Sequence, residues 1–85
     1  MDLKEQFEKA VIDSKSLPAK PDNDILLQLY ALYKQGTEGD INTEAPSNPF
    51  DFVGKAKHEA WASVAGKTKD AAMEAYVALV TKLKG

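Results

Sequence analysis

The sequence contains no cysteine, which excludes disulfides, thiolate chemistry and cysteine-ligated zinc sites. No apolar run approaches the roughly 20 residues that a membrane-spanning helix needs. The N-terminal stretch MDLKEQFEKA lacks a continuous apolar segment, so we expect no secretory signal. The formal net charge is −2, whereas general nucleic-acid binding requires a basic surplus. Any anion must therefore be bound by a local group of lysines.

Catalytic patterns are also missing from the sequence. The single histidine, His58, lies about 100° around its helix from Lys57, on the polar side, and is expected to be a surface residue. There is no Gly-x-Ser-x-Gly elbow, phosphate-binding loop or His-x-x-x-His pair, and no two carboxylates are marked out for acid–base work. We therefore expect a protein that is not an enzyme and that holds neither a metal nor a cofactor.

Length and periodicity predict one all-α domain over residues 1–85, built from four helices. The first helix is predicted over residues 3–15, where apolar residues recur on one face. Pro18 and Pro21 prevent this helix from continuing, and Pro21 suits the first turn of the second helix. Gly36 and Gly39 offer termination sites for that helix.

A long polar connection over residues 37–49 is predicted between the second and third helices. Connections of this length are unusual in compact domains and are often functional. Asp51 is a plausible N-cap for the third helix, which is expected to run to about Val64, and Thr68 caps the fourth. The fourth helix has the clearest apolar face, comprising Ala72, Met73, Tyr76, Leu79, Val80 and Leu83.

Two groups of residues are candidates for ligand binding. Tyr30, Tyr33 and Lys34 fall within an arc of roughly 100° on the second helix, because positions i, i+3 and i+4 are neighbours. Lys57 stands near the centre of an apolar face on the third helix, where an unpaired charge is costly if buried. If the two helices are neighbours, aromatic rings and cations converge. Such a site suits a ligand with a flat ring and a phosphate.

Each candidate also has a purely structural explanation. The stem of Lys57 can pack while its ammonium reaches water, and Lys34 alone would be a solvated surface lysine. The two tyrosines can be aromatics at the edge of the core. Tyr76 is explained first by core packing, although its hydroxyl needs a partner, which a ligand oxygen could supply. Lys15, at the edge of the first apolar face, indicates nothing by itself.

The sequence nevertheless resembles the acyl-CoA-binding protein family over essentially its whole length. The motifs that carry the resemblance are YALYKQGTEGDINTEAP at positions 30–46, DFVGKAKHEAW at 51–61 and the segment Ala72-Met73-x-Ala75-Tyr76. The family resemblance implies an up-down-down-up four-helix bundle that binds medium- and long-chain fatty acyl-CoA esters. It further implies a cytoplasmic, monomeric carrier without stable membrane insertion.

The resemblance also implies the roles of individual residues. Positions matching Tyr30, Tyr33 and Lys34 contact the adenine and the ribose 3′-phosphate in the family, and the position matching Lys57 joins the phosphate cluster. Positions matching Lys15 and Tyr76 also lie at the ligand. The sequence departs from the family where Val53 replaces a common lysine, His58 an aromatic and Ala45 an arginine, and its loop over residues 47–49 looks about one residue longer.

Two other functions are alternatives to acyl-CoA binding. A helical interaction module would dock a partner helix or peptide on the second helix, and it remains the alternative. An acyl carrier domain is rejected because it needs a phosphopantetheine-accepting serine. The nearest candidate, Ser14, lies on the apolar face of the first helix and lacks the Asp-Ser-Leu context.

Overall fold

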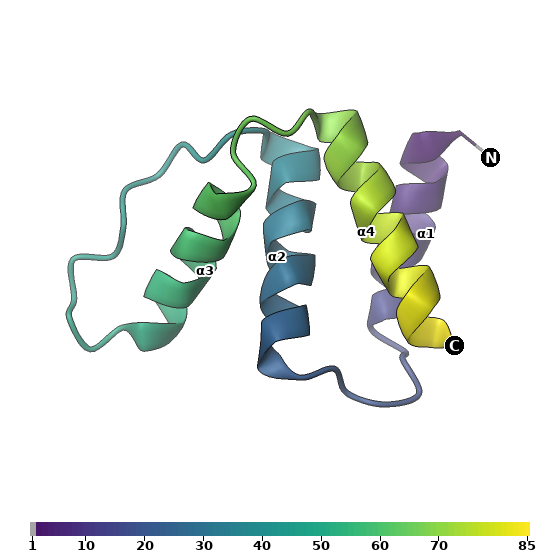
Figure 1. Ribbon diagram of the computed structural model, residues 1–85, viewed down its shortest axis with the longest axis horizontal. Helices are drawn as coiled ribbons and strands as arrows, with labels where there is room; N and C mark the ends of the chain where they lie inside the picture. The colour runs from purple at the N-terminus through teal and green to yellow at the C-terminus, as the bar shows by residue number, and fades with distance from the viewer. Residues whose placement is uncertain (1) are drawn as a thin grey trace.

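The computed structural model describes residues 2–85 and contains four α-helices (Figure 1). They are α1 (Leu3–Ser14), α2 (Asn23–Glu38), α3 (Phe52–Ser63) and α4 (Lys69–Lys84). In Figure 1, α1 and α4 run in one direction and α2 and α3 in the other, so the predicted up-down-down-up order is confirmed. Met1, the first residue of the predicted domain, lies outside the described residues.

Each helix begins at a side-chain cap. Asp2, Asp22, Asp51 and Thr68 each accept a hydrogen bond of 2.8–3.1 Å from the backbone N–H three residues later. The predicted caps Asp51 and Thr68 are confirmed. The prediction that Pro21 lies in the first turn of the second helix is wrong by two residues. Asp22 is the cap, because its carboxylate satisfies a free N–H at the helix start, and α2 begins only after it.

The end of α2 lies at Glu38, with Gly39 as its C-cap at a φ of 85°. Gly36 does not end the helix, and Thr37 and Glu38 are helical rather than part of the predicted connection. A Cβ on Gly36 would lie 3.2 Å from Cγ of Met73. This glycine therefore permits the close approach of α2 and α4, and the positive φ that favours glycine occurs at Gly39 instead.

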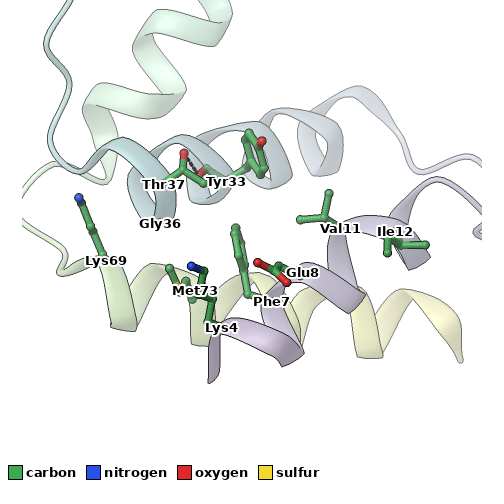
Figure 2. A pocket seen from close by; sticks show the side chains of 10 residues that line it. All are labelled: Lys4, Phe7, Glu8, Val11, Ile12, Tyr33, Gly36, Thr37, Lys69 and Met73. Carbon is green, nitrogen blue, oxygen red and sulfur yellow. Dashed lines mark hydrogen bonds between the residues drawn. The ribbon is translucent and has the colours of Figure 1, made fainter. Parts of the chain in front are cut away.

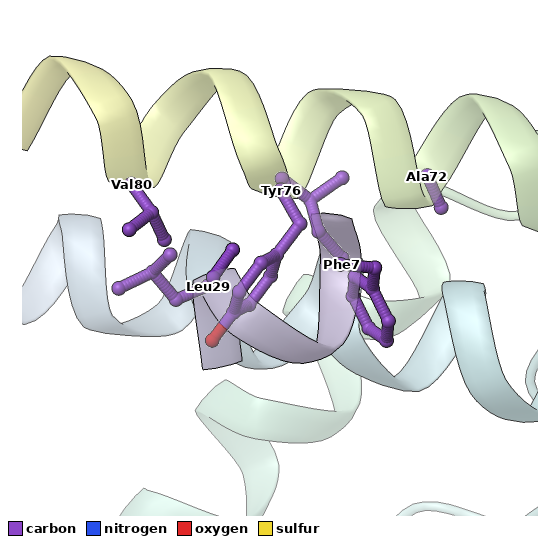
Figure 3. Close-up of a cluster of buried hydrophobic side chains, with 7 residues drawn as sticks. Phe7, Leu29, Ala72, Tyr76 and Val80 are labelled. Carbon is purple, nitrogen blue, oxygen red and sulfur yellow. The ribbon is translucent and has the colours of Figure 1, made fainter. Parts of the chain in front are cut away.

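The core is formed by α1, α2 and α4 (Figure 3). In residues 2–85 the closely packed helix pairs are α2 with α4, α1 with α4 and α2 with α3, whereas the backbones of α1 and α2 lie further apart and the two helices meet through side chains such as Phe7 and Tyr33. The buried side chains of the main core cluster are Phe7, Ala10, Leu29, Leu32, Ala72, Tyr76 and Val80, and the last three belong to the predicted apolar face of the fourth helix. Fully burying an aliphatic or aromatic side chain contributes about 1.5–3 kcal/mol. The arrangement leaves α3 outside this core, against α2 alone.

Helix α3 is held on α2 by a buried polar group. Gln35 is fully buried, and its amide donates to Oδ1 of Asp40 (2.8 Å) and to the backbone carbonyl of Lys67 (2.7 Å). Nε1 of Trp61 donates to Oε1 of Gln35 (3.2 Å) and to the carbonyl of Gly39 (3.0 Å). One side chain thus joins the end of α2, helix α3, the connection that follows α2 and the turn before α4. We call this set of contacts the Gln35 network.

Asp40 completes the Gln35 network from the exposed connection. Its Oδ1 also accepts the backbone N–H of Gly66 at 2.8 Å. The Gly66 N–H, and after it the Gln35 amide, stabilise the carboxylate and hold the pKa of Asp40 below its ordinary value of 3.8. The beginning of the long connection is therefore fixed to the α3–α4 turn.

Candidate functional site

The structure brings Tyr30 of α2 and Lys57 of α3 together. Nζ of Lys57 lies 5.3 Å from the centroid of the Tyr30 ring, a cation–π contact that keeps the ammonium accessible. Lys57 is exposed, so the cost of a buried charge does not arise. Tyr30 is half-buried and forms the ridge between the side of α2 that faces α3 and the side that faces α1.

Tyr33, three residues later, turns towards α1 and α4 instead. Its ring stacks on Phe7 with a centroid separation of 6.0 Å and lies 6.5 Å from the ring of Tyr76. It remains 41% exposed, so one face of the ring is available. The two tyrosines are neighbours on α2, but only Tyr30 contacts a cation from α3.

Lys34 points towards α3 but is already engaged. Its ammonium forms an ion pair with Glu38, one turn later in α2, and lies 5.0 Å from the centroid of the Trp61 ring. The hydrogen bond to Glu38 raises the pKa of Lys34, with burial opposing the shift and the charge of Glu38 adding to it. Lys34 and Lys57, the two lysines predicted to bind phosphate, therefore lie on the same helix pair in different electrostatic surroundings.

An open apolar hollow of about 370 Å³, here called the α2–α3 hollow, begins beside Tyr30 and Lys57. Its large apolar side chains Phe52, Val53 and Leu26 are 73%, 66% and 36% exposed. This amount of exposed apolar surface at one place is typical of a site that receives a ligand. The lining residues are Asn23, Leu26, Leu27, Tyr30, Phe52, Val53, Ala56 and Lys57.

The predicted apolar face of the third helix therefore divides into two parts. Trp61 is buried against α2, whereas Val53 and Lys57 line the open hollow, and Phe50, before the helix, is 80% exposed. Sequence reasoning missed Phe52, which lies directly after the cap Asp51. The signal that was available is a large aromatic side chain at the first position of a helix, off the main apolar face.

Lys15 lies on the other side of Tyr30. It is the C-cap of α1 and lines a second hollow of about 320 Å³, here called the Lys15 hollow, with both site tyrosines and Tyr76. The remaining lining residues are Val11, Ser14, Leu26 and Leu29. Because Tyr30 borders both hollows, a ligand lying across its ring could reach Lys15 and Lys57 together.

Tyr76 is buried in the core, and its hydroxyl is satisfied within the protein. It donates to Oγ of Ser14 at 3.1 Å, and Ser14 donates to the carbonyl of Val11 at 2.7 Å. Burial raises the pKa of Tyr76. A ligand oxygen is therefore not required as its hydrogen-bond partner, although the side chain also lines the Lys15 hollow.

A third and larger hollow, of about 620 Å³, lies between α1 and α2 over α4 (Figure 2). Phe7 and Met73 form its apolar part, and Lys4, Glu8 and Lys69 supply its charged side chains. Figure 2 also shows Thr37 donating to the carbonyl of Tyr33, at 2.8 Å. Tyr33 is the one predicted site residue that borders this hollow.

His58 lies partly exposed at the surface, as its helical position predicts, and it also contacts the long connection. Nε2 lies 3.1 Å from the carbonyl oxygen of Thr43, which can only accept, so Nε2 is the donor in this contact. The residue is half-buried and ties α3 to the long connection. Ala45, another departure from the family pattern, is exposed in the same connection.

Within residues 2–85, no group of three histidines or acidic residues is placed to hold a metal ion. No helix in the described part of the chain has both the length and the apolar character to cross a bilayer. The features that could bind a ligand are the Tyr30–Lys57 contact, the Lys34–Glu38 pair and the adjoining apolar hollows.

The sequence model of the family described as "Acyl CoA binding protein" matches residues 4–80. "Acyl-CoA-binding protein homolog 1" of Caenorhabditis elegans is 52% identical over 77 residues, which cover 91% of this chain and 88% of that protein. The acyl-CoA-binding protein of Gossypium hirsutum is 47% identical over 83 residues, covering 98% and 92% of the two chains.

Solved structures agree with the sequence comparison. The crystal structure of Oryza sativa acyl-CoA-binding protein 2 superposes with a TM-score of 0.91 at 39% identity, covering 96% of this chain and 90% of that one. The crystal structure of ACBP from Moniliophthora perniciosa gives a TM-score of 0.88 at 41% identity, with coverages of 98% and 80%. With sequence and fold in agreement, this chain belongs to the acyl-CoA-binding protein family.

Proposed function

We propose that this protein binds medium- and long-chain fatty acyl-CoA esters reversibly, and that it acts as a monomeric cytoplasmic carrier and pool former rather than as an enzyme. The observation that carries the proposal is the α2–α3 hollow, an open apolar surface that begins at a cation lying over an aromatic ring. Acyl-CoA combines the matching features, because it has a long alkyl chain, phosphates and a flat purine. Residues 1–85 then form one acyl-CoA-binding domain.

In this proposal the head group lies over Tyr30 and Tyr33. Adenine packs on an exposed tyrosine face, which contributes about 1 kcal/mol. Lys57 and Lys34 bind phosphate oxygens from the α3 side, and Lys15 reaches the head group from the α1 side. Each charge-assisted contact contributes roughly 1.5–3 kcal/mol. Tyr76 contributes by packing beside the ring of Tyr33, with 6.5 Å between the two ring centroids.

The acyl chain lies in the α2–α3 hollow in this proposal. Each sheltered methylene contributes up to about 0.8 kcal/mol, so ten would supply roughly 8 kcal/mol before ordering costs are subtracted. Val53, which replaces a lysine common in the family, lines this hollow and is 66% exposed. Valine at position 53 thus removes one cation near the phosphates of the ligand and adds apolar surface along its acyl chain. The tail therefore sets most of the affinity and the head group sets selectivity.

Isothermal titration with palmitoyl-CoA, free CoA and palmitate tests the proposal. We expect palmitoyl-CoA to bind far more tightly than either part, because only the whole ligand fills both the charged and the apolar regions. Equal affinity for all three would contradict the proposed site. Absence of heat with palmitoyl-CoA would favour the interaction module, and a series of acyl lengths would define the preferred chain.

Lys34→Ala tests the head-group assignment, with Lys9→Ala on the exposed face of α1 as a matched control. We expect Lys34→Ala to weaken palmitoyl-CoA binding by roughly 10-fold or more, and the control to leave it unchanged. Lys34 is partly exposed, so its loss should lower the free energy of unfolding by no more than about 1 kcal/mol. A variant that loses its helical circular dichroism would instead assign Lys34 a structural role.

A further inference from the structure

Glu38 occupies an unfavourable place for a carboxylate. It is the last residue of α2, where the free backbone carbonyls give the helix end a partial negative charge. The last turn of α2 contains no basic residue. The ion pair with Lys34 is the contact that offsets this cost, and 41% of the Glu38 side chain remains exposed. The carboxylate thus lies at the surface beside the proposed head-group site.

The two lysines assigned to phosphate binding on this face are held differently. The Lys57 ammonium lies over the Tyr30 ring, and among residues 2–85 no carboxylate is within ion-pair distance of it. The Lys34 ammonium contacts the Trp61 ring and is also paired with Glu38. A phosphate that approaches Lys34 therefore meets a cation whose charge is already partly neutralised, and a carboxylate that repels it.

We propose that Glu38 is a specificity-determining residue that competes with the ligand phosphate for the Lys34 ammonium and thereby weakens the binding of phosphate-bearing head groups. This inference rests on the proposed function. On binding, Lys34 exchanges one anionic partner for another. The phosphate contact therefore contributes to the binding free energy only the difference between the two ion pairs. On release, Glu38 replaces the phosphate, so the ammonium is not left without a partner. Such competition suits a carrier that must give up its ligand.

The test compares the wild type with Glu38→Gln, which keeps the shape of the side chain and removes its charge. Affinities are measured by titration at low ionic strength with palmitoyl-CoA and with S-palmitoyl-pantetheine, which has the acyl thioester but no phosphate. We expect Glu38→Gln to bind palmitoyl-CoA about two- to fivefold more tightly, the range typical of one exposed charge pair. The affinity for S-palmitoyl-pantetheine should not change, and the gain should shrink as salt is added.

Two further variants separate local competition from a general charge effect. Glu74→Gln makes the same change in net charge on the exposed surface of α4, and should leave palmitoyl-CoA affinity unaltered. Lys34→Met removes the contested ammonium, and adding Glu38→Gln to it should then produce no gain beyond that of Glu74→Gln. A structural role for Glu38 would change the affinity for both ligands and would persist in the Lys34→Met background.

The outcomes distinguish this inference from the proposed function on which it rests. If the wild type binds palmitoyl-CoA but Glu38→Gln binds it no more tightly, Glu38 does not compete, while the proposed function stands. An equal gain in Glu74→Gln, or a gain with S-palmitoyl-pantetheine, also overturns the inference alone. If the wild type does not bind palmitoyl-CoA at all, the proposed function fails and the inference fails with it.

Discussion

Replacing Gln35 by leucine tests the polar contact that holds α3 in place. The substitution conserves side-chain size but removes two donated hydrogen bonds and one accepted bond from a fully buried position. Trp61 keeps its bond to the Gly39 carbonyl, so its Nε1 is not left unpaired. The Lys67 carbonyl loses its Gln35 donor in a partly buried position, and an acceptor left unsatisfied on burial costs about 1–3 kcal/mol.

We expect Gln35→Leu to lower the free energy of unfolding by about 1.5–4.5 kcal/mol. This sums the orphaned carbonyl and the lost bond to Trp61, which contributes about 0.5–1.5 kcal/mol. Domains of this size are stable by roughly 4–13 kcal/mol, so the loss should be large enough to measure without preventing folding. Urea unfolding followed by far-ultraviolet circular dichroism gives the value. The tryptophan emission should also change, because Trp61 is the single tryptophan and loses a hydrogen bond.

Gln28→Leu is the matched control, because Gln28 is exposed two turns earlier on the same helix. Its effect should remain within about 0.5 kcal/mol. If Gln35→Leu cost less than about 1 kcal/mol, or no more than the control, the Gln35 network would not be what holds α3 on α2. The position of the two site lysines would then need another explanation.

Three further predictions concern the packing and the pH response. The Gly66 N–H lowers the pKa of Asp40, so this carboxylate stabilises the fold at pH values above its ordinary pKa of 3.8. The contribution is lost as the pH falls through the lower pKa of the folded state. The stability of Asp40→Asn should therefore depend less on pH than that of the wild type in acid titrations. Tyr76→Phe should cost about 1 kcal/mol in urea unfolding, because it removes the bond to Ser14, and no change would mean that this bond contributes nothing net. Gly36→Val should cost about 1–3 kcal/mol through overpacking against α4, and a variant as stable as the wild type would contradict the close approach of the two helices.

The sequence predicts which residues form the candidate site more fully than it predicts the contacts that they make. Tyr30, Tyr33 and Lys34 share a helix face because of a local repeat, and the structure confirms that α2 and α3 are neighbours. The pairing of Lys34 with Glu38 also follows a local i, i+4 spacing, so it could have been read from the sequence. The cation–π contacts with Trp61 and Lys57 could not, because they depend on how α3 is rotated against α2.

By itself the sequence determined what depends on neighbouring residues. Helix caps such as Asp51 and Thr68, and the four apolar faces, arise from hydrogen bonds and spacings within a few positions of the chain. Only the tertiary structure decided that Gly36 continues its helix, since that outcome depends on contact with α4. It likewise decided that the Tyr76 hydroxyl is satisfied by Ser14, which is 62 positions away in the chain. Long-range packing selects among partners that local patterns leave equally possible.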